Sequence, residues 1–66
     1  MTTKYPHIKV KLIGEDGNAV AIVMRCRQAG RRAGLSEGEL TRFLDEALSS
    51  DYNNVITTAR DWFRCY

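Results

Sequence analysis

The chain has 66 residues, of which 44% are hydrophobic and 27% are charged, and its formal net charge at pH 7 is +2. A chain of this length forms one domain at most and buries only about 60% of the surface that its unfolded form exposes. Its longest apolar run, at 19–24, is far shorter than the roughly 20 residues that cross a bilayer. These features exclude a second domain and a membrane-spanning helix, and they predict a single small globular domain over 1–66.

The charges are unevenly distributed along the chain. Residues 1–34 hold seven Lys and Arg against two acids, whereas residues 35–66 hold three against six, so the two parts carry +5 and −3. Such asymmetry marks either a part that binds polyanions or two parts of one fold that attract each other.

The first predicted element is a strand at His7–Ile13, which follows an expected flexible leader at 1–6. Apolar and polar residues alternate there, and this period of two is typical of a half-buried strand. One side of the strand carries Ile8, Val10 and Leu12, and the other carries His7, Lys9, Lys11 and Ile13. The glycines and acids of Gly14–Gly17 then predict a turn.

The second predicted element is a helix from Ala19 to Arg32. Asn18 or Asp16 is placed to cap its first turn, and Gly34 is a favoured residue for the left-handed position after its end. Gly30 lies among the apolar residues and lowers helix propensity, so we expect another helix or the strand to pack closely there. The apolar side of this helix consists of Ala19, Ile22, Val23, Cys26, Gly30 and Ala33.

Two further helices are predicted over 37–48 and 52–66. Ser36 and Glu39 have the spacing of a capping box, with Leu35 and Leu40 placed as a hydrophobic staple, and Asp51 is placed to cap the last helix. The apolar side of the first contains Leu40, Phe43, Leu44, Ala47 and Leu48. That of the second contains Tyr52, Val55, Ile56, Ala59, Trp62, Phe63 and Tyr66.

A single strand is not stable without a partner. The partner is the chain's end around Phe63–Tyr66, the leader around Thr3–Tyr5, or another subunit, and we favour the chain's end because Phe63, Cys65 and Tyr66 suit a strand as well as a helix. The predicted fold is therefore a small α+β domain in which one N-terminal strand precedes three amphipathic helices and a short C-terminal strand pairs with the first.

The sequence gives no sign of catalysis. His7, the only histidine, lies on the outward side of the predicted strand, and Cys26 lies on the apolar side of the first helix, which predicts a buried, inert thiol. Cys65 lacks the spacing of a redox or zinc motif, and the chain has no phosphate-binding loop or nucleophile elbow. We therefore predict that the protein is not an enzyme and uses neither a cofactor nor a metal.

The cysteines and the N-terminal residues are the features from which we predict the cellular compartment. Residues 2–6 contain no apolar run of the kind that a secretory signal needs. We expect reduced thiols in a cytoplasmic protein, with one disulfide between Cys26 and Cys65 as the alternative.

The polar side of the first helix is the candidate interaction surface. Arginines near a helix C-terminus have a structural explanation, because each gains about 0.3–1 kcal/mol from the helix dipole. The alternatives are contacts with nucleic-acid phosphates, with an acidic partner, or with the acidic second helix of another copy. Val20 and Met24 form an apolar pair beside Arg27. If the pair is exposed, it suits a protein interface; the alternative is that it broadens the side of the helix that faces the core. One flank of this surface comprises Arg25, Gln28 and Arg32, and the other comprises Val20, Met24, Arg27 and Arg31.

The chain resembles a group of short uncharacterised bacterial and phage-associated proteins. The most specific part of the resemblance is the Gly-x-Asp-Gly-Asn-Ala element at 14–19. The rest lies at Ile8–Ile22, Arg31–Leu35, Phe43, Glu46-Ala47, Asp51-Tyr52 and Trp62. The resemblance implies a small stand-alone protein from a phage or mobile element, and it brings no activity or site residues.

The sequence thus favours a non-enzymatic protein-binding or regulatory module that acts through the outer face of the first helix on another protein or on a second copy. The alternative is a nucleic-acid-binding protein in which Arg25, Arg27, Arg31 and Arg32 contact phosphates. The two differ in salt dependence, because phosphate contacts weaken steeply as salt rises.

Overall fold

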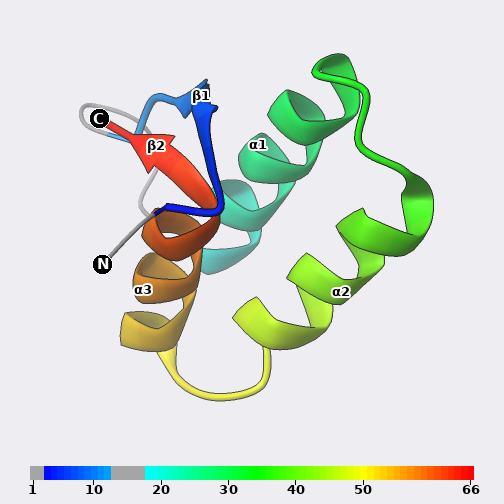
Figure 1. Cartoon of the computed structure of the whole chain (residues 1–66). Coiled ribbons are helices and arrows are strands. Elements are labelled where there is room, and N and C mark those ends of the chain that lie inside the picture. Colours follow the sequence, from blue (N-terminus) through cyan, green and yellow to red (C-terminus); the bar gives the residue numbers. More distant parts are fainter. Residues whose placement is uncertain (1–2, 13–17) are drawn as a thin grey trace.

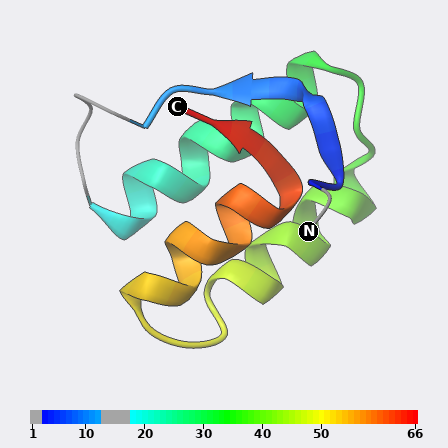
Figure 2. The same ribbon diagram turned by 60° about the vertical axis from the view of Figure 1, so that its left-hand side comes forward.

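The computed structural model describes residues 3–12 and 18–66. Three helices pack beneath a two-stranded parallel sheet (Figures 1 and 2). The elements in chain order are β1 (Tyr5–Val10), α1 (Ala19–Arg32), α2 (Glu37–Ala47), α3 (Tyr52–Trp62) and β2 (Phe63–Cys65). The chain is a small α+β domain, and the prediction that its end pairs with the first strand is confirmed.

The sheet joins the two ends of the described chain. Its strands are parallel because the three helices between them form the long crossover that a parallel pair requires. Lys9 lies opposite Arg64 and Val10 lies opposite Cys65. Helix α1 contacts β1 and α3 contacts β2, so one face of the sheet is covered. The predicted alternation along β1 follows, with Ile8 and Val10 buried and the side chains at positions 7, 9 and 11 exposed.

Helix α1 has the predicted bounds because both of its ends carry clear signals. The Asn18 side chain accepts a hydrogen bond of 2.8 Å from the Val20 amide, and Gly34 has a φ of +97°. A Cβ at Gly30 would lie only 2.8 Å from Cδ2 of Leu40. Close packing at Gly30 is therefore confirmed, and α2 is the element that packs there.

Helix α2 begins with half of the predicted capping box. The Ser36 hydroxyl accepts a hydrogen bond of 3.2 Å from the Glu39 amide, as expected. The prediction of a reciprocal bond, in which the Ser36 amide donates to the Glu39 carboxylate, is wrong. That carboxylate instead accepts from the Tyr5 hydroxyl and pairs with Lys4, because the start of β1 lies beside this end of α2.

Helix α3 is held at its start by Asp51, which accepts a hydrogen bond of 3.0 Å from the Asn54 amide as predicted. The Asn54 side chain also donates to the carbonyls of Glu46 and Ala47, at 2.9 and 3.2 Å. These carbonyls belong to the last turn of α2, which has no further turn to supply partners. Asn54 therefore ties the end of α2 to the beginning of α3.

The core is centred on aromatic rings. The Phe43 ring lies 5.2 Å from that of Phe63 and 5.4 Å from that of Trp62, in edge-to-face geometry, and the Tyr5 ring lies 6.0 Å from Trp62. Such pairs contribute about 0.5–1.5 kcal/mol each beyond the burial of their area. The remaining buried apolar residues are Ile8, Val10, Ile22, Val23, Cys26, Leu40, Ala47, Val55 and Ala59.

Some boundaries differ from the prediction. β1 begins at Tyr5 and ends at Val10, and the Lys4 amide donates to the Asp61 carbonyl at 2.8 Å, so residues 3–6 of the expected leader belong to the folded domain. Four residues predicted to lie on apolar helix faces are exposed because each lies at or beyond the end of an element: Ala33, Leu48, Tyr52 and Tyr66. Residues 1–2, Ile13 and the predicted turn at 14–17 lie outside the described residues.

Candidate functional site

One flank of the predicted surface is exposed but partly neutralised. Val20 and Met24 have 65% and 45% of their area exposed. Arg27 and Arg31, which continue this flank, both pair with Glu37 of α2, the former at 3.3 Å. The hydrogen bond from Arg31 and the charge of both arginines lower the pKa of Glu37. Two of the four predicted arginines therefore share a carboxylate of the same chain.

The other flank of α1 lies beside β1, where the surface is hollowed. Two adjoining depressions of about 220 and 330 Å³ lie between the strand and the helix, and we call them together the basic groove. The helix side consists of Arg25, Gln28, Ala29, Arg32 and Ala33, and the strand side consists of residues 7–11.

The lining of the basic groove has one sign of charge. Arg25 and Arg32 come from the helix, Lys9 comes from the strand, and Lys11 lies just after the strand. Within residues 3–12 and 18–66, no acidic side chain lines either depression. Charges of one sign along a concave surface focus the electrostatic potential and attract an anionic ligand.

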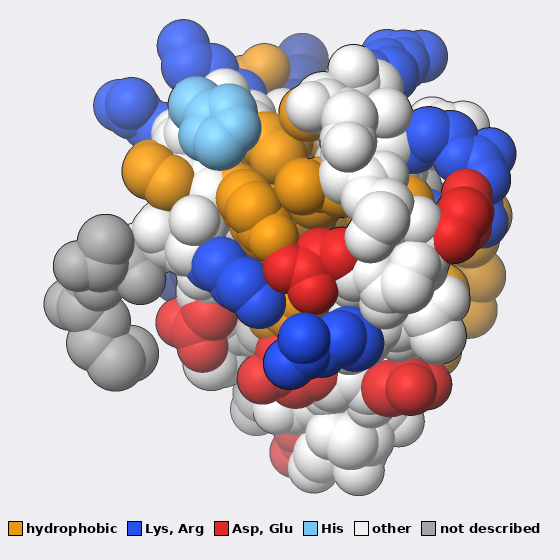
Figure 3. Space-filling view, turned by 45° about the vertical axis from the view of Figure 1, so that its right-hand side comes forward, with side chains coloured by type: hydrophobic (Ala, Val, Ile, Leu, Met, Phe, Trp, Pro, Cys, Tyr) orange, Lys and Arg blue, Asp and Glu red, His pale blue; other side chains and the backbone are white. Residues whose placement is uncertain are grey.

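The uneven charge along the sequence becomes uneven charge in space. Figure 3 shows mostly Lys and Arg at the top of the view, where β1 and the C-terminal end of α1 lie, and Asp and Glu mostly lower down. The ion pairs of Lys4 with Glu39, and of Arg27 and Arg31 with Glu37, join the two parts of the chain, as the interpretation of mutual attraction expects. Binding of anions stays a prediction.

Sequence reasoning found half of the basic groove. Arg25, Gln28 and Arg32 were predicted as one flank of the helix, whereas Lys9 and Lys11 were seen only as the outward side of a strand. The alternation of polar and apolar residues in the strand placed both lysines on one side, and it was the only sequence signal for them. Nothing in the spacing says which helix flank the strand lies beside, so their meeting required the fold.

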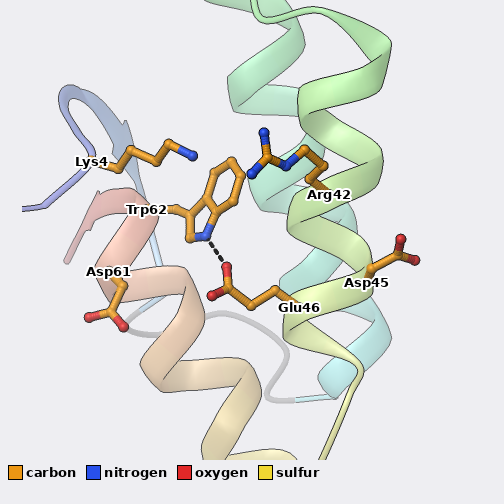
Figure 4. Close-up of a pocket in the computed structure, with 6 residues that line it drawn as sticks. All are labelled: Lys4, Arg42, Asp45, Glu46, Asp61 and Trp62. Atoms are coloured by element: carbon orange, nitrogen blue, oxygen red, sulfur yellow. Dashed lines mark hydrogen bonds between the residues drawn. The ribbon is translucent and has the colours of Figure 1, made fainter.

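A second hollow, of about 600 Å³, lies between α2, α3 and the residue before β1, and we call it the Trp62 hollow (Figure 4). The Lys4 ammonium lies 3.9 Å from the centroid of the Trp62 ring. The indole N–H donates a hydrogen bond to the Glu46 carboxylate, and Asp45 and Asp61 point away from the ring. Positive and negative groups are mixed here.

The two cations of the Trp62 hollow are paired with a carboxylate of the same chain. Lys4 lies 3.3 Å from Glu39, and Arg42 lies 3.7 Å from the same carboxylate. The hydrogen bond from Tyr5, with those cations, lowers the pKa of Glu39, and the same bond raises the pKa of Tyr5. These contacts join the start of β1 to α2 and α3, so this hollow has a structural explanation.

The residues tested for chemistry are dispersed, apart from the two cysteines. His7 is exposed on β1, as predicted, and lines the basic groove. Cys26 is buried, as predicted, and Cys65 is half-buried. A hydrogen bond with Cys65, together with burial, raises the pKa of the Cys26 thiol far above its ordinary range, which suits an unreactive group. Among the described residues, no group of three or more His, Cys, Asp and Glu is placed to hold a metal ion.

Comparison with known proteins adds no relative. No family model, no curated protein and no solved structure matches the chain. The resemblance to short phage-associated proteins and a cytoplasmic location therefore stay predictions. In the part of the chain that the structure describes, no helix has the length and apolarity needed to span a membrane.

Proposed function

We propose that this protein is a non-enzymatic binding module whose basic groove takes an acidic segment of a partner protein. The observation that carries the proposal is the lining of the groove, where two elements contribute cations and no carboxylate lies among the described lining residues. An acidic segment would meet cations on both walls, Lys9 and Lys11 on the strand side and Arg32 on the helix side.

A purely structural explanation accounts for only part of the groove. Arg32 lies in the last turn of α1, where the helix dipole favours a cation. Lys9 lies within β1 and Lys11 just after it, so neither gains from a helix end. Placing both lysines beside Arg32 raises mutual repulsion, which an acidic ligand would relieve.

The alternative ligand, nucleic acid, is less well supported. Its predicted contacts were four arginines of α1, and two of these pair with Glu37. No Phe, Tyr or Trp lines the groove in the described part of the chain, whereas single-stranded nucleic acids bind largely by stacking on such rings. The remaining alternative, a second copy that offers its acidic α2, is weakened because Glu37 and Glu39 of α2 already pair within their own chain.

Two double variants with equal charge test the proposal. Lys9→Gln with Arg32→Gln removes two cations of the basic groove, and Arg27→Gln with Arg31→Gln removes the two that pair with Glu37. Fluorescence anisotropy measures the binding of a labelled peptide that alternates glutamate with valine, and of a labelled single-stranded DNA, at low and moderate salt.

We expect the groove variant to weaken peptide binding tenfold or more, and its control to change binding less than threefold. Equal weakening by the two variants would mean that only net charge matters, which would overturn the proposal. Absence of peptide binding, or tighter binding of DNA than of the peptide at moderate salt, would also overturn it.

A further inference from the structure

We infer that the acidic segment binds by adding to the free edge of β1 as a third strand of the sheet. This inference rests on the proposed function, because it describes how the basic groove holds its ligand. It adds a backbone interaction to the charge interaction, and the two can be tested separately.

The hydrogen bonds to β2 show which edge of β1 is free. The Tyr66 amide donates to the Val10 carbonyl at 2.9 Å, and the Leu12 amide donates to the Tyr66 carbonyl, so Val10 and Leu12 turn their backbone groups toward β2. Successive residues of an extended chain direct these groups to opposite edges. Lys9 and Lys11 therefore present their N–H and C=O groups to the other edge, along which no strand pairs in the described chain.

This free edge opens onto the basic groove. Lys9, Val10 and Lys11 form one wall of the basic groove, and the flank of α1 with Arg25, Gln28 and Arg32 forms the other wall. An extended segment paired with β1 would direct alternate side chains toward Arg25, Gln28 and Arg32. The intervening side chains would lie beside the exposed side chains of His7, Lys9 and Lys11.

The charges select the occupant of this edge. Cations face both sides of the space for an added strand, so glutamate or aspartate is favoured at successive positions. A second β1 from another copy would place its own lysines beside Lys9 and Lys11, and like charges on neighbouring strands repel. Lysines on an edge strand also discourage pairing between copies.

Two measurements separate strand addition from binding by charge alone. The first compares the glutamate–valine peptide with a version in which every amide carries an N-methyl group, because methylation removes the backbone donors and keeps the side-chain charges. The second follows amide hydrogen exchange of the free and peptide-saturated protein, residue by residue, by NMR.

We expect N-methylation to weaken binding at least tenfold. We also expect the parent peptide to slow exchange at Lys9 and Lys11 at least tenfold, with little change at Val10 and Leu12, which face β2. Equal affinity for the two peptides, or no slowing at Lys9 and Lys11, would overturn strand addition. If the matched charge variants still differ as proposed, such a result leaves acidic-segment binding in place; if no peptide binds, both proposals fail.

Discussion

The basic groove and the Trp62 hollow are both concave and both lined by charged side chains, yet they differ in how these charges are balanced. In the Trp62 hollow, Lys4 lies against an aromatic face and 3.3 Å from Glu39, so the folded chain uses the charges for its own stability. In the basic groove, Lys9, Lys11 and Arg32 line one space, and no carboxylate lies among the described lining residues. The comparison teaches that balance of charge, rather than the size of a hollow, distinguishes a structural contact from a candidate binding site.

The largest expected difference between the regions is in stability. Trp62 is only 6% exposed and packs against three other rings, so Trp62→Ala should lower the free energy of unfolding by about 3–5 kcal/mol. That is roughly the whole stability of a domain this small. Urea denaturation measures the loss. Lys9→Gln is the control from the groove, and it should change the value by less than about 0.5 kcal/mol. Similar losses in both variants would break the comparison.

Acid should destabilise the domain through Glu39. Its pKa is lowered in the folded state, so its contribution is complete above the ordinary glutamate pKa of about 4.3 and is lost as pH falls through the lowered value. The free energy of unfolding, measured from pH 6 to pH 3, should therefore decline less in Tyr5→Phe, which removes the hydrogen bond from Tyr5 to Glu39.

The groove supplies the matching control for this pH dependence. The described lining of the groove contains no carboxylate, so Lys9→Gln with Arg32→Gln should keep the decline of the unmodified protein. An unchanged decline in Tyr5→Phe, or a flattened one in the groove variant, would contradict the assignment of charges to the two regions.

A smaller effect is expected for the cation over Trp62. Lys4→Gln removes the ammonium group that lies 3.9 Å from the ring centroid, and we expect a loss of about 0.5–1 kcal/mol, because the side chain is 43% exposed. Denaturation followed by the fluorescence of this single tryptophan measures it. No loss of stability would show that Lys4 contributes nothing to the hollow.

The smallest expected effect is a change in the free energy of unfolding that differs between the two regions. Lys11→Gln relieves repulsion in the groove and should raise the free energy of unfolding by about 0.2–0.5 kcal/mol at low salt, whereas Arg42→Gln removes a partner of Glu39 and should not raise it. The difference should shrink at high salt. A rise of equal size in both variants would mean that net charge alone governs stability.

The sequence predicted the elements well wherever local chemistry decides. Asn18 and Gly34 fix the ends of α1, and the alternation from His7 assigns the buried face of β1. It failed where partners come from distant segments, because spacing does not give distances between elements. Glu39 accepts a hydrogen bond from Tyr5 instead of from the Ser36 amide, and Glu46 accepts one from the indole of Trp62. The Asn54 side chain donates to a carbonyl at the end of α2.

The candidate site shows the same division. The flank of α1 with Arg25, Gln28 and Arg32 followed from helical geometry alone. The neutralisation of Arg27 and Arg31 by Glu37, and the approach of Lys9 and Lys11 from β1, depend on how α2 and the strand pack against α1. The two predicted flanks of α1 therefore have different surroundings: one faces Glu37 of α2 and the other faces the strand.

The most direct test is a titration of the isotope-labelled protein with the glutamate–valine peptide, followed by NMR chemical shifts. We expect the largest shifts at residues of the basic groove, at Lys9, Lys11, Gln28 and Arg32, with small shifts at Val20, Met24 and the Trp62 indole. Largest shifts at Val20 and Met24, or at Trp62, would contradict this expectation, as would a spectrum that the peptide leaves unchanged.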